Sequence, residues 1–162
     1  MVRFREDQRF RQWWLLALLL VPVAPFAYGM YVQLALGRKW GTKPISEAGL
    51  LVVGVLVLGV PVWFWFLRLI TEVHDDAVHV HFIPLWRKRI IPIRDIRTAA
   101  AVTYRPLRDY GGWGIRWGPR GQAYNVSGDR GVQLELANGK RLLIGSQRPE
   151  ELEAAIGRPR VL

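Results

Sequence analysis

Two long runs of apolar residues lie near the start of the chain, at residues 13–36 and 48–67, and neither run contains a charged residue. The second run has twenty residues, which at about 1.5 Å per residue makes a helix about 30 Å long. This length matches the hydrocarbon core of a bilayer. The pattern therefore predicts a transmembrane hairpin over residues 12–68, with helices at about 13–36 and 48–67 and a polar turn at 37–47.

The first apolar run has the features of a membrane helix. Trp13 and Trp14 open it, and tryptophan favours the membrane interface. Pro22 and Pro25 predict a kink, which lipid-embedded helices accommodate. A cleaved signal peptide is the alternative, since Arg11 precedes the run. The run is longer than a usual signal core and no A-x-A site closes it, which favours a retained helix.

The distribution of lysine and arginine predicts the orientation of the hairpin. Residues 1–11 include four arginines, and Arg68 and the cations at 87–89 follow the second run, whereas the turn at 37–47 holds three cations. Positive charge gathers on the cytoplasmic side. We therefore expect a multi-pass protein of the cell (inner) membrane with both termini in the cytoplasm. Residues 1–11 are interpreted as a basic N-terminal tail that lies along the membrane surface.

Beyond the second apolar run, apolar and polar residues alternate with the period of a β-strand. Residues 69–74 and 78–82 predict two strands, and Asp75-Asp76 predicts the turn of a hairpin. The implied pairs across this hairpin are Val73 with Val78, Thr71 with Val80, and Glu72 with His79.

Further strands are predicted along the rest of the chain. Pro92 restricts the segment 90–93 to a sheet edge or a bulge, because proline has no N–H to donate. Asn138-Gly139 is a strong signal for a tight hairpin turn. Arg94-Asp95-Ile96 predicts a bend, and residues 105–112 are predicted to form the longest irregular loop. The other predicted strands lie at residues 97–104, 113–117, 123–126, 132–136 and 142–144.

The chain closes with one amphipathic helix at about residues 149–156. Pro149 and the two acids that follow suit the first turn of a helix, and Leu152, Ala155 and Ile156 give the helix one apolar face. The predicted β domain therefore spans residues 69–157, and residues 158–162 are a short tail.

The element order resembles that of the bacterial pleckstrin-homology-like (PH-like) domains that follow a transmembrane hairpin in small membrane proteins of uncharacterised function. The resemblance covers residues 69–156. It rests on the strand order and on the segments IIPIRDI (90–96), VQLELANGKRLLIGS (132–146) and RPEEL (148–152). It implies a bent antiparallel sheet, or partly open barrel, of about seven strands capped by the C-terminal helix. The resemblance implies that the domain serves in binding and assembly. It implies no catalytic residues. Lipid-binding pleckstrin domains carry cations in the first hairpin loop, whereas HDDA at 74–77 is acidic here.

Composition further limits the classes of function that the protein can have. The chain has no cysteine, which excludes disulfides and thiolate metal sites. Its formal net charge of +10 implies affinity for an acidic surface, and anionic membrane lipids suit a membrane protein. Nucleic-acid binding is not expected, because residues 69–162 carry fifteen cations against ten acids, a net of +5, and no helix has a basic stripe. Enzyme activity is not expected either, since no serine lies in a nucleophile elbow.

Two groups of residues are candidates for a partner or lipid surface. The first is a basic stretch suited to anionic headgroups, Trp86, Arg87, Lys88 and Arg89. The second combines arginines with aromatic rings, as binding hot spots do, and comprises Arg105, Arg108, Tyr110, Trp113 and Arg116. The alternative is that Trp113 and Trp117, at even spacing, point inward as part of the core and that the arginines form a solvated rim.

Two other patterns carry weaker chemistry. His79 and His81 share one face of a strand, as zinc ligands can, but Glu72 opposite His79 is explained more simply by a cross-strand ion pair. The glycine-rich run at 111–121 is not followed by a helix, so it is interpreted as turns and bulges rather than as a phosphate cradle. We therefore predict no metal and no cofactor.

Together these patterns predict a non-enzymatic integral membrane protein that presents a PH-like interaction domain at the cytoplasmic membrane surface. The domain would bind a membrane-associated protein partner, anionic lipid headgroups or both. The alternative is a small accessory subunit of a transporter or other membrane complex that acts mainly through its transmembrane hairpin. The sequence makes no prediction of oligomeric state.

Overall fold

The computed structural model describes residues 1–41, 45–84 and 88–157 of the 162-residue chain. The chain divides into two compact units. The helical unit comprises Arg11–Phe66, and the β unit comprises Met1–Phe10 together with Leu67–Leu162. The β unit therefore draws on the sequence both before and after the helical unit.

The helical unit contains two helical stretches that are long and apolar enough to cross a membrane. The first, Trp13–Ala35, consists of α1 (Trp13–Leu20), α2 (Val23–Met30) and a π-helical turn, η1 (Tyr31–Ala35). The second is α3 (Glu47–Phe66). Both predicted apolar helices are thus confirmed, with bounds that differ by one residue. Part of the predicted turn at 37–47, residues 42–44, lies outside the described residues.

The predicted proline kink lies between α1 and α2. Pro22 precedes α2 and cannot donate a backbone hydrogen bond, so the helix is interrupted there. Beyond the kink, α2 packs against α3 at a glycine. A methyl group on Gly54 would lie 3.2 Å from the Met30 sulfur and 3.3 Å from a Phe26 ring carbon, so the absence of a side chain permits this close approach.

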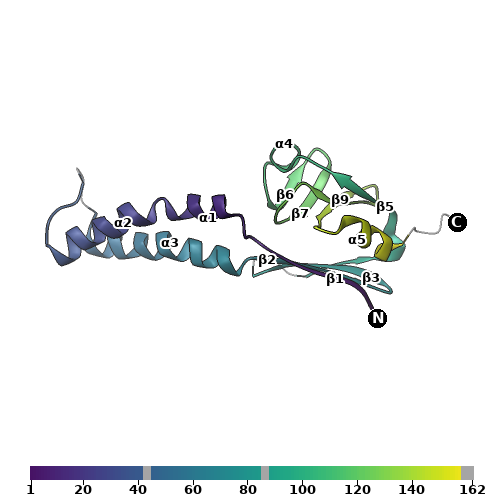
Figure 1. Cartoon of the computed structure of the whole chain (residues 1–162), viewed down its shortest axis with the longest axis horizontal. Helices are drawn as coiled ribbons and strands as arrows, with labels where there is room; N and C mark the ends of the chain where they lie inside the picture. The colour runs from purple at the N-terminus through teal and green to yellow at the C-terminus, as the bar shows by residue number, and fades with distance from the viewer. Residues whose placement is uncertain (42–44, 85–87, 158–162) are drawn as a thin grey trace. The chain divides into compact units, whose positions relative to one another are not determined.

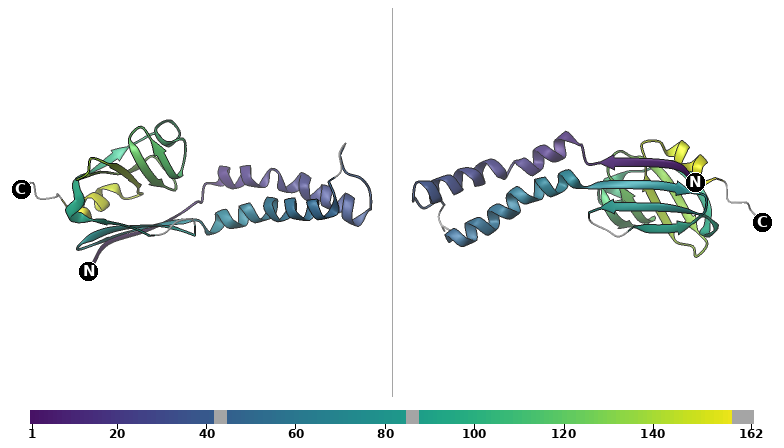
Figure 2. Two further views of the ribbon diagram at one scale, coloured as in Figure 1. Left: turned by 180° about the vertical axis from the view of Figure 1, so that it is seen from behind. Right: turned by 90° about the horizontal axis from the view of Figure 1, so that it is seen from below.

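The first sheet of the β unit is antiparallel, with the order β1 (Val2–Arg9), β2 (Arg68–His74), β3 (Ala77–Ile83) and β4 (Arg89–Pro92) (Figure 2). The predicted hairpin register is confirmed, since β2 and β3 pair Val73 with Val78, Thr71 with Val80 and Glu72 with His79. Pro92 lies on β4, the edge strand, as predicted.

The N-terminal segment is not a surface tail, and that prediction was wrong. Residues 2–9 form β1, which pairs with β2 along its length. Phe4, Glu6 and Gln8 are buried, while the other charged residues of the strand, Arg3, Arg5, Asp7 and Arg9, are exposed. Because two of these three inward residues are polar, the segment lacks the apolar alternation that would have predicted a strand.

Buried hydrogen bonds compensate the cost of burying the polar side chains of Glu6 and Gln8 on β1. The Glu6 carboxylate accepts from the Ser146 hydroxyl at 2.6 Å and from the Gln147 backbone N–H at 2.8 Å. The Gln8 amide donates to the Gly145 carbonyl at 2.7 Å. These bonds connect β1 to the segment that leads out of the second sheet.

The second sheet has the order β5 (Ile96–Thr103), β8 (Arg130–Leu136), β9 (Arg141–Gly145), β7 (Gly121–Asn125) and β6 (Gly114–Gly118). The predicted Asn138-Gly139 hairpin joins β8 to β9. Within the described residues there are nine strands in two sheets and no closed barrel. The predicted mainly β content is confirmed. The expected bent antiparallel sheet, or partly open barrel, of about seven strands is corrected in strand number and pairing, because β1 adds a strand and β7 pairs in parallel with β9.

The C-terminal helix α5 (Pro149–Ile156) packs against both sheets, through β1 and β2 on one side and β5 and β8 on the other (Figure 1). Leu152 and Ile156 are buried, which confirms the predicted apolar face. Two short helices replace predicted irregular segments. These are η2 (Ile93–Asp95), at the predicted bend, and α4 (Pro106–Tyr110), within the predicted loop 105–112.

Candidate functional site

A polar cavity of about 450 Å³ lies in the β unit where β5 ends and α4 begins. Three arginines and two aspartates contribute to its wall, together with a threonine and a tyrosine. The lining residues are Thr103, Tyr104, Arg105, Arg108, Asp109, Arg120 and Asp129. The cavity therefore joins side chains from α4, from the β6–β7 turn and from the segment before β8.

The local sequence shapes α4 at the rim of this cavity. Pro106 occupies the first turn, where its missing N–H has no partner to lose. Gly111 ends the helix in the left-handed conformation at φ 72°, which glycine adopts without steric cost. Gly118 on β6 lets the strand approach closely, since a methyl group there would overlap the Asp109 carbonyl.

Asp109 organises two of the arginines. Its Oδ2 accepts a hydrogen bond from the Arg105 backbone N–H at 2.9 Å and lies 3.8 Å from the Arg120 guanidinium. The Asp109 side chain is 17% exposed, so this arrangement is partly shielded from solvent. One carboxylate thus holds the start of α4 and the β6–β7 turn together.

Arg105 and Arg108 remain available to a ligand. Both are exposed, and within the described part of the chain neither guanidinium forms an ion pair. Exposed arginines present several N–H donors in a planar fork that matches phosphate and carboxylate groups. The cavity can therefore accept an anionic group without first breaking a salt bridge at these two residues.

Two buried tyrosines form the base of this region. Tyr104 and Tyr110 meet edge to face with ring centroids 5.9 Å apart. The Tyr104 hydroxyl accepts a hydrogen bond from the Asn125 amide at 3.1 Å. Burial raises the pKa of Tyr104 to about 12 and also raises the pKa of Tyr110, so both rings stay neutral at physiological pH. They add no negative charge that would repel an anion.

The arginine and aromatic group predicted from the sequence is only partly at this cavity. Arg105 and Arg108 line it, but Tyr110 is buried and donates to Gln133 at 3.4 Å. Its assignment to a partner surface is corrected, because Tyr110 belongs to the core. The alternative had placed Trp113 and Trp117 in the core, but Trp117 is 68% exposed. Trp113 and Arg116 are not among the lining residues. The Trp113 indole donates to Gly128, and the Arg116 guanidinium donates to the Trp113 carbonyl, each at 3.0 Å.

Sequence reasoning missed three members of the cavity wall, Thr103, Arg120 and Asp129. Thr103 lies in the predicted strand at 97–104. Arg120 lies in the glycine-rich run at 111–121, and Asp129 lies between the predicted strands at 123–126 and 132–136. Their residue types were visible, but only the pairing of β6, β7 and β8 brings Arg120 and Asp129 to α4.

The basic stretch at 86–89, predicted as a headgroup surface, is only partly described by the structure. Trp86 and Arg87 lie outside the described residues, and Lys88 is exposed. Arg89 is turned inward: its guanidinium donates to Gln122 and, at 3.3 Å, to the Tyr124 hydroxyl, and it lies 5.8 Å from the centre of the Tyr124 ring. Arg89 therefore ties β4 to β7, and its assignment to a headgroup surface is corrected.

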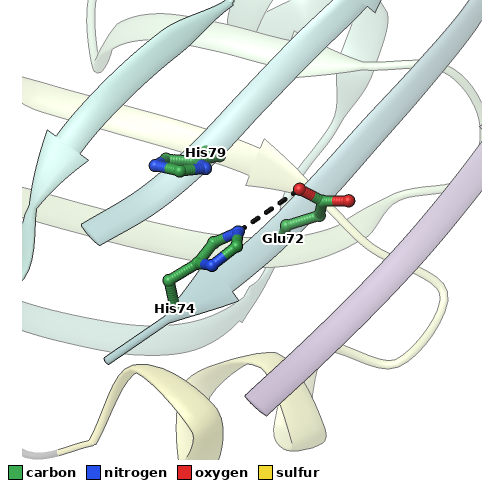
Figure 3. Close-up of side chains that lie close together, drawn as sticks. All are labelled: Glu72, His74 and His79. Atoms are coloured by element: carbon green, nitrogen blue, oxygen red, sulfur yellow. Dashed lines mark hydrogen bonds and ion pairs between the residues drawn. The ribbon is translucent and has the colours of Figure 1, made fainter. Parts of the chain in front are cut away.

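One cluster of metal-ligating residue types lies on the first sheet, away from the cavity lining (Figure 3). Glu72 and His74 come from β2, and His79 comes from β3. Glu72 pairs with His79 in register, as predicted, but its carboxylate interacts with His74 at 3.3 Å and Arg5 at 3.4 Å. The two histidines that share a strand face in the sequence pattern are His79 and His81, but the cluster instead combines His79 with His74. Burial lowers the pKa of His79, which favours its neutral ring.

Comparison with known proteins adds one finding about the whole chain. The model of DUF6141, described as a family of unknown function, matches residues 1–159, which include segments of both units. No curated protein matches the sequence.

Proposed function

The chain belongs to DUF6141, and we propose that it is a membrane-anchored, non-enzymatic binding protein whose β unit receives an anionic group. The group is a phosphate or a carboxylate, carried by a lipid headgroup or by a membrane-associated protein partner. It enters the arginine-lined cavity beside α4. No nucleic acid and no cofactor take part in this function.

The composition and exposure of the helical unit support membrane anchoring. The two candidate spans have mean hydropathies of 2.0 and 2.3, and in each only 11% of the most apolar 18-residue window is buried. A helix that is apolar on all sides needs an apolar environment. Within this unit the neighbouring helices leave most of that surface uncovered, and lipid would cover it.

The pairing of β1 with β2 supports a single location for the β unit. Because residues 1–10 and 67–157 belong to one folded unit, two membrane crossings between them return the chain to the side from which it started. The excess of lysine and arginine outside the turn favours the cytoplasmic face of the inner membrane.

The architecture of the β unit is compatible with a binding role of the PH-like type. Antiparallel strands in two sheets are followed by a C-terminal helix that packs against both sheets. We propose a PH-like relationship on this basis, with the added strand β1 as its main departure. Function within such a fold depends on its surface rather than on the fold itself.

The observation that carries the proposal is that Arg105 and Arg108 are exposed and that neither guanidinium forms an ion pair with another described residue. Two exposed apolar side chains, Leu107 on α4 and Trp117 on β6, are 69% and 68% exposed on elements that contact each other. Arginine beside exposed aromatic and aliphatic side chains is typical of binding hot spots. Among the described lining residues there is no histidine, cysteine or lysine, so the usual base-activated nucleophiles are missing and binding is favoured over catalysis.

Photo-crosslinking in native membranes tests this function. A photoreactive amino acid replaces Leu107 in the full-length chain, and the adduct is identified by mass spectrometry as a lipid or a protein. The double variant R105E/R108E is expected to lose the adduct, because each charge-assisted hydrogen bond is worth about 1.5–3 kcal/mol, or at least tenfold in affinity. The matched control is R97E/R141E, which reverses two exposed arginines outside the cavity lining.

Four outcomes decide between the candidates. A lipid adduct lost in R105E/R108E identifies a headgroup, and a protein adduct lost in the same variant identifies a protein partner. An adduct equally strong in R105E/R108E and in the control refutes the cavity as the binding site. A protein that instead copurifies only when residues 13–35 and 47–66 are native would favour the accessory-subunit alternative.

A further inference from the structure

Two imidazoles and one carboxylate converge on the outer, partly exposed face of the first sheet (Figure 3). One ligand atom from each of Glu72, His74 and His79 lies within 4.8 Å of the other two. Two histidines and a glutamate are a donor set that zinc and related divalent transition metals use in proteins. The cluster does not share a residue with the arginine-lined cavity.

The spacing of the cluster is close to that of a bound ion. Ligands about 2.0–2.1 Å from a tetrahedral ion are about 3.3 Å from each other. The His74 Nε2 and Glu72 Oε2 atoms are 3.3 Å apart. The centre of the His79 ring lies 4.3 Å from that of His74. A ring nitrogen of His79 therefore has to approach from at most 4.8 Å to about 3.3 Å, which a small side-chain rotation at a partly exposed position provides.

The strands hold these three residues in place before any ion binds. Glu72 and His79 are directly paired across β2 and β3, and His74 follows two residues after Glu72 on the same face. The adjacent turn is held by Asp75, which bonds the N-terminal ammonium at 2.5 Å and the Arg3 guanidinium at 2.8 Å. Ligands on a fixed hairpin need little reorganisation to bind a metal.

The polar atoms around the cluster are arranged as they are around a metal site. Arg5 contacts Oε1 of Glu72 at 3.4 Å, whereas Oε2 faces His74. Such an outer contact orients a carboxylate ligand. The Nδ1 atom of His79 is buried and has no hydrogen-bond partner among the described residues. Buried polar atoms are normally satisfied, and a bound ion would supply a partner for this nitrogen.

We propose that Glu72, His74 and His79 bind one divalent transition-metal ion of the zinc type. Three protein ligands leave a fourth coordination position for water or for a donor from a binding partner. Arg5 and Lys88 add positive charge near the ion and Asp76 adds negative charge. This inference does not depend on the function proposed for the cavity.

Metal titration of the full-length protein tests the site. The protein is purified in detergent without a histidine tag, treated with chelator, and titrated with Co²⁺ by absorption spectroscopy and with Zn²⁺ by calorimetry. The wild type is expected to bind one ion per chain and to show the ligand-field spectrum of bound Co²⁺. H74Q and H79Q are each expected to raise the Kd about tenfold or more.

The third histidine provides the matched control. His81 lies on the same face of β3 but outside the cluster, so H81Q is expected to keep the Kd and the Co²⁺ spectrum of the wild type. Far-ultraviolet circular dichroism verifies that each variant is folded. The proposal is overturned if the folded wild type binds neither ion at micromolar concentrations, or if H81Q weakens binding as much as H79Q. It is equally overturned if H74Q/H79Q binds as the wild type does.

Discussion

Replacing Glu6 with alanine is expected to detach β1 from the second sheet of the β unit. Glu6 is only 7% exposed. Its two carboxylate oxygens accept hydrogen bonds from the Ser146 hydroxyl and the Gln147 backbone N–H, at 2.6 and 2.8 Å. Both donors lie in the connection between β9 and α5. The E6A variant removes both acceptors at once and leaves these two donors without their partner.

The expected loss is a few kcal/mol. Each hydrogen bond to a charged group contributes about 1.5–3 kcal/mol, which gives about 3–6 kcal/mol for two. Alanine also removes the desolvation cost of a buried carboxylate, so the net destabilisation is smaller, about 2–4 kcal/mol. E6Q is expected to lose less than E6A. It keeps an acceptor for the Gln147 N–H, and the Ser146 hydroxyl can accept from the new amide.

Hydrogen exchange of the full-length protein in detergent, followed by mass spectrometry, measures this loss of stability at β1 itself. A destabilisation of about 2–4 kcal/mol speeds exchange of the β1 amides about 30- to 700-fold, if they exchange through detachment of the strand. D7A is the control on the opposite face. Asp7 lies 3.7 Å from Arg68 in an exposed pair, and such pairs contribute about 0–1 kcal/mol. Equal, small changes in E6A and D7A would refute the structural role of Glu6.

Three further predictions concern pH, topology and backbone packing. Because the pKa of Tyr104 rises from 10.0 in the unfolded chain to about 12 in the fold, the native state keeps a proton that the unfolded state loses. The free energy of unfolding should therefore fall by about 2 kcal/mol between pH 10 and 12. Y104F should remove most of this slope in denaturant titrations, and an unchanged slope would contradict the burial of that hydroxyl. Since the chain has no cysteine, V2C and N138C should react with a membrane-impermeant thiol reagent only after cells are opened, and R38C should react in spheroplasts. Labelling of V2C and N138C from opposite sides would exclude the two-crossing arrangement. G118A should lower the thermal stability of the β unit, because the added methyl group would overlap a backbone carbonyl of α4; a melting temperature equal to that of the wild type would show that β6 can move away.

Local patterns predicted those elements whose physics is local. The apolar runs correspond to α1, α2, η1 and α3 because a charge-free stretch of this length has few other stable environments. The register of β2 with β3 follows from alternation and a two-residue turn signal, and Pro92 lies on an edge because it lacks an N–H. The apolar face of α5 could likewise be read from Leu152 and Ile156.

Strand β1 could not be predicted in the same way. Its inward positions include Glu6 and Gln8, whose hydrogen-bond partners lie about 140 residues further along the chain, at separations of 140 and 137. A polar residue is predicted from sequence to be exposed unless its distant hydrogen-bond partner is known. The same limit explains Arg89, which the sequence presents as part of a basic surface and the fold turns toward Gln122 and Tyr124.

The candidate sites were only partly predictable from the sequence. The amino-acid sequence alone established the apolar spans, the hairpin that carries Glu72 and His79, and the presence of Arg105 and Arg108 beside aromatic residues. Only the tertiary structure brought Arg120 and Asp129 to those arginines, placed Tyr110 in the core, and joined the N-terminal segment to the β unit. The physical reason is that periodicity reports a residue's immediate neighbours. Burial and charge pairing, in contrast, depend on contacts that chain folding makes between distant segments.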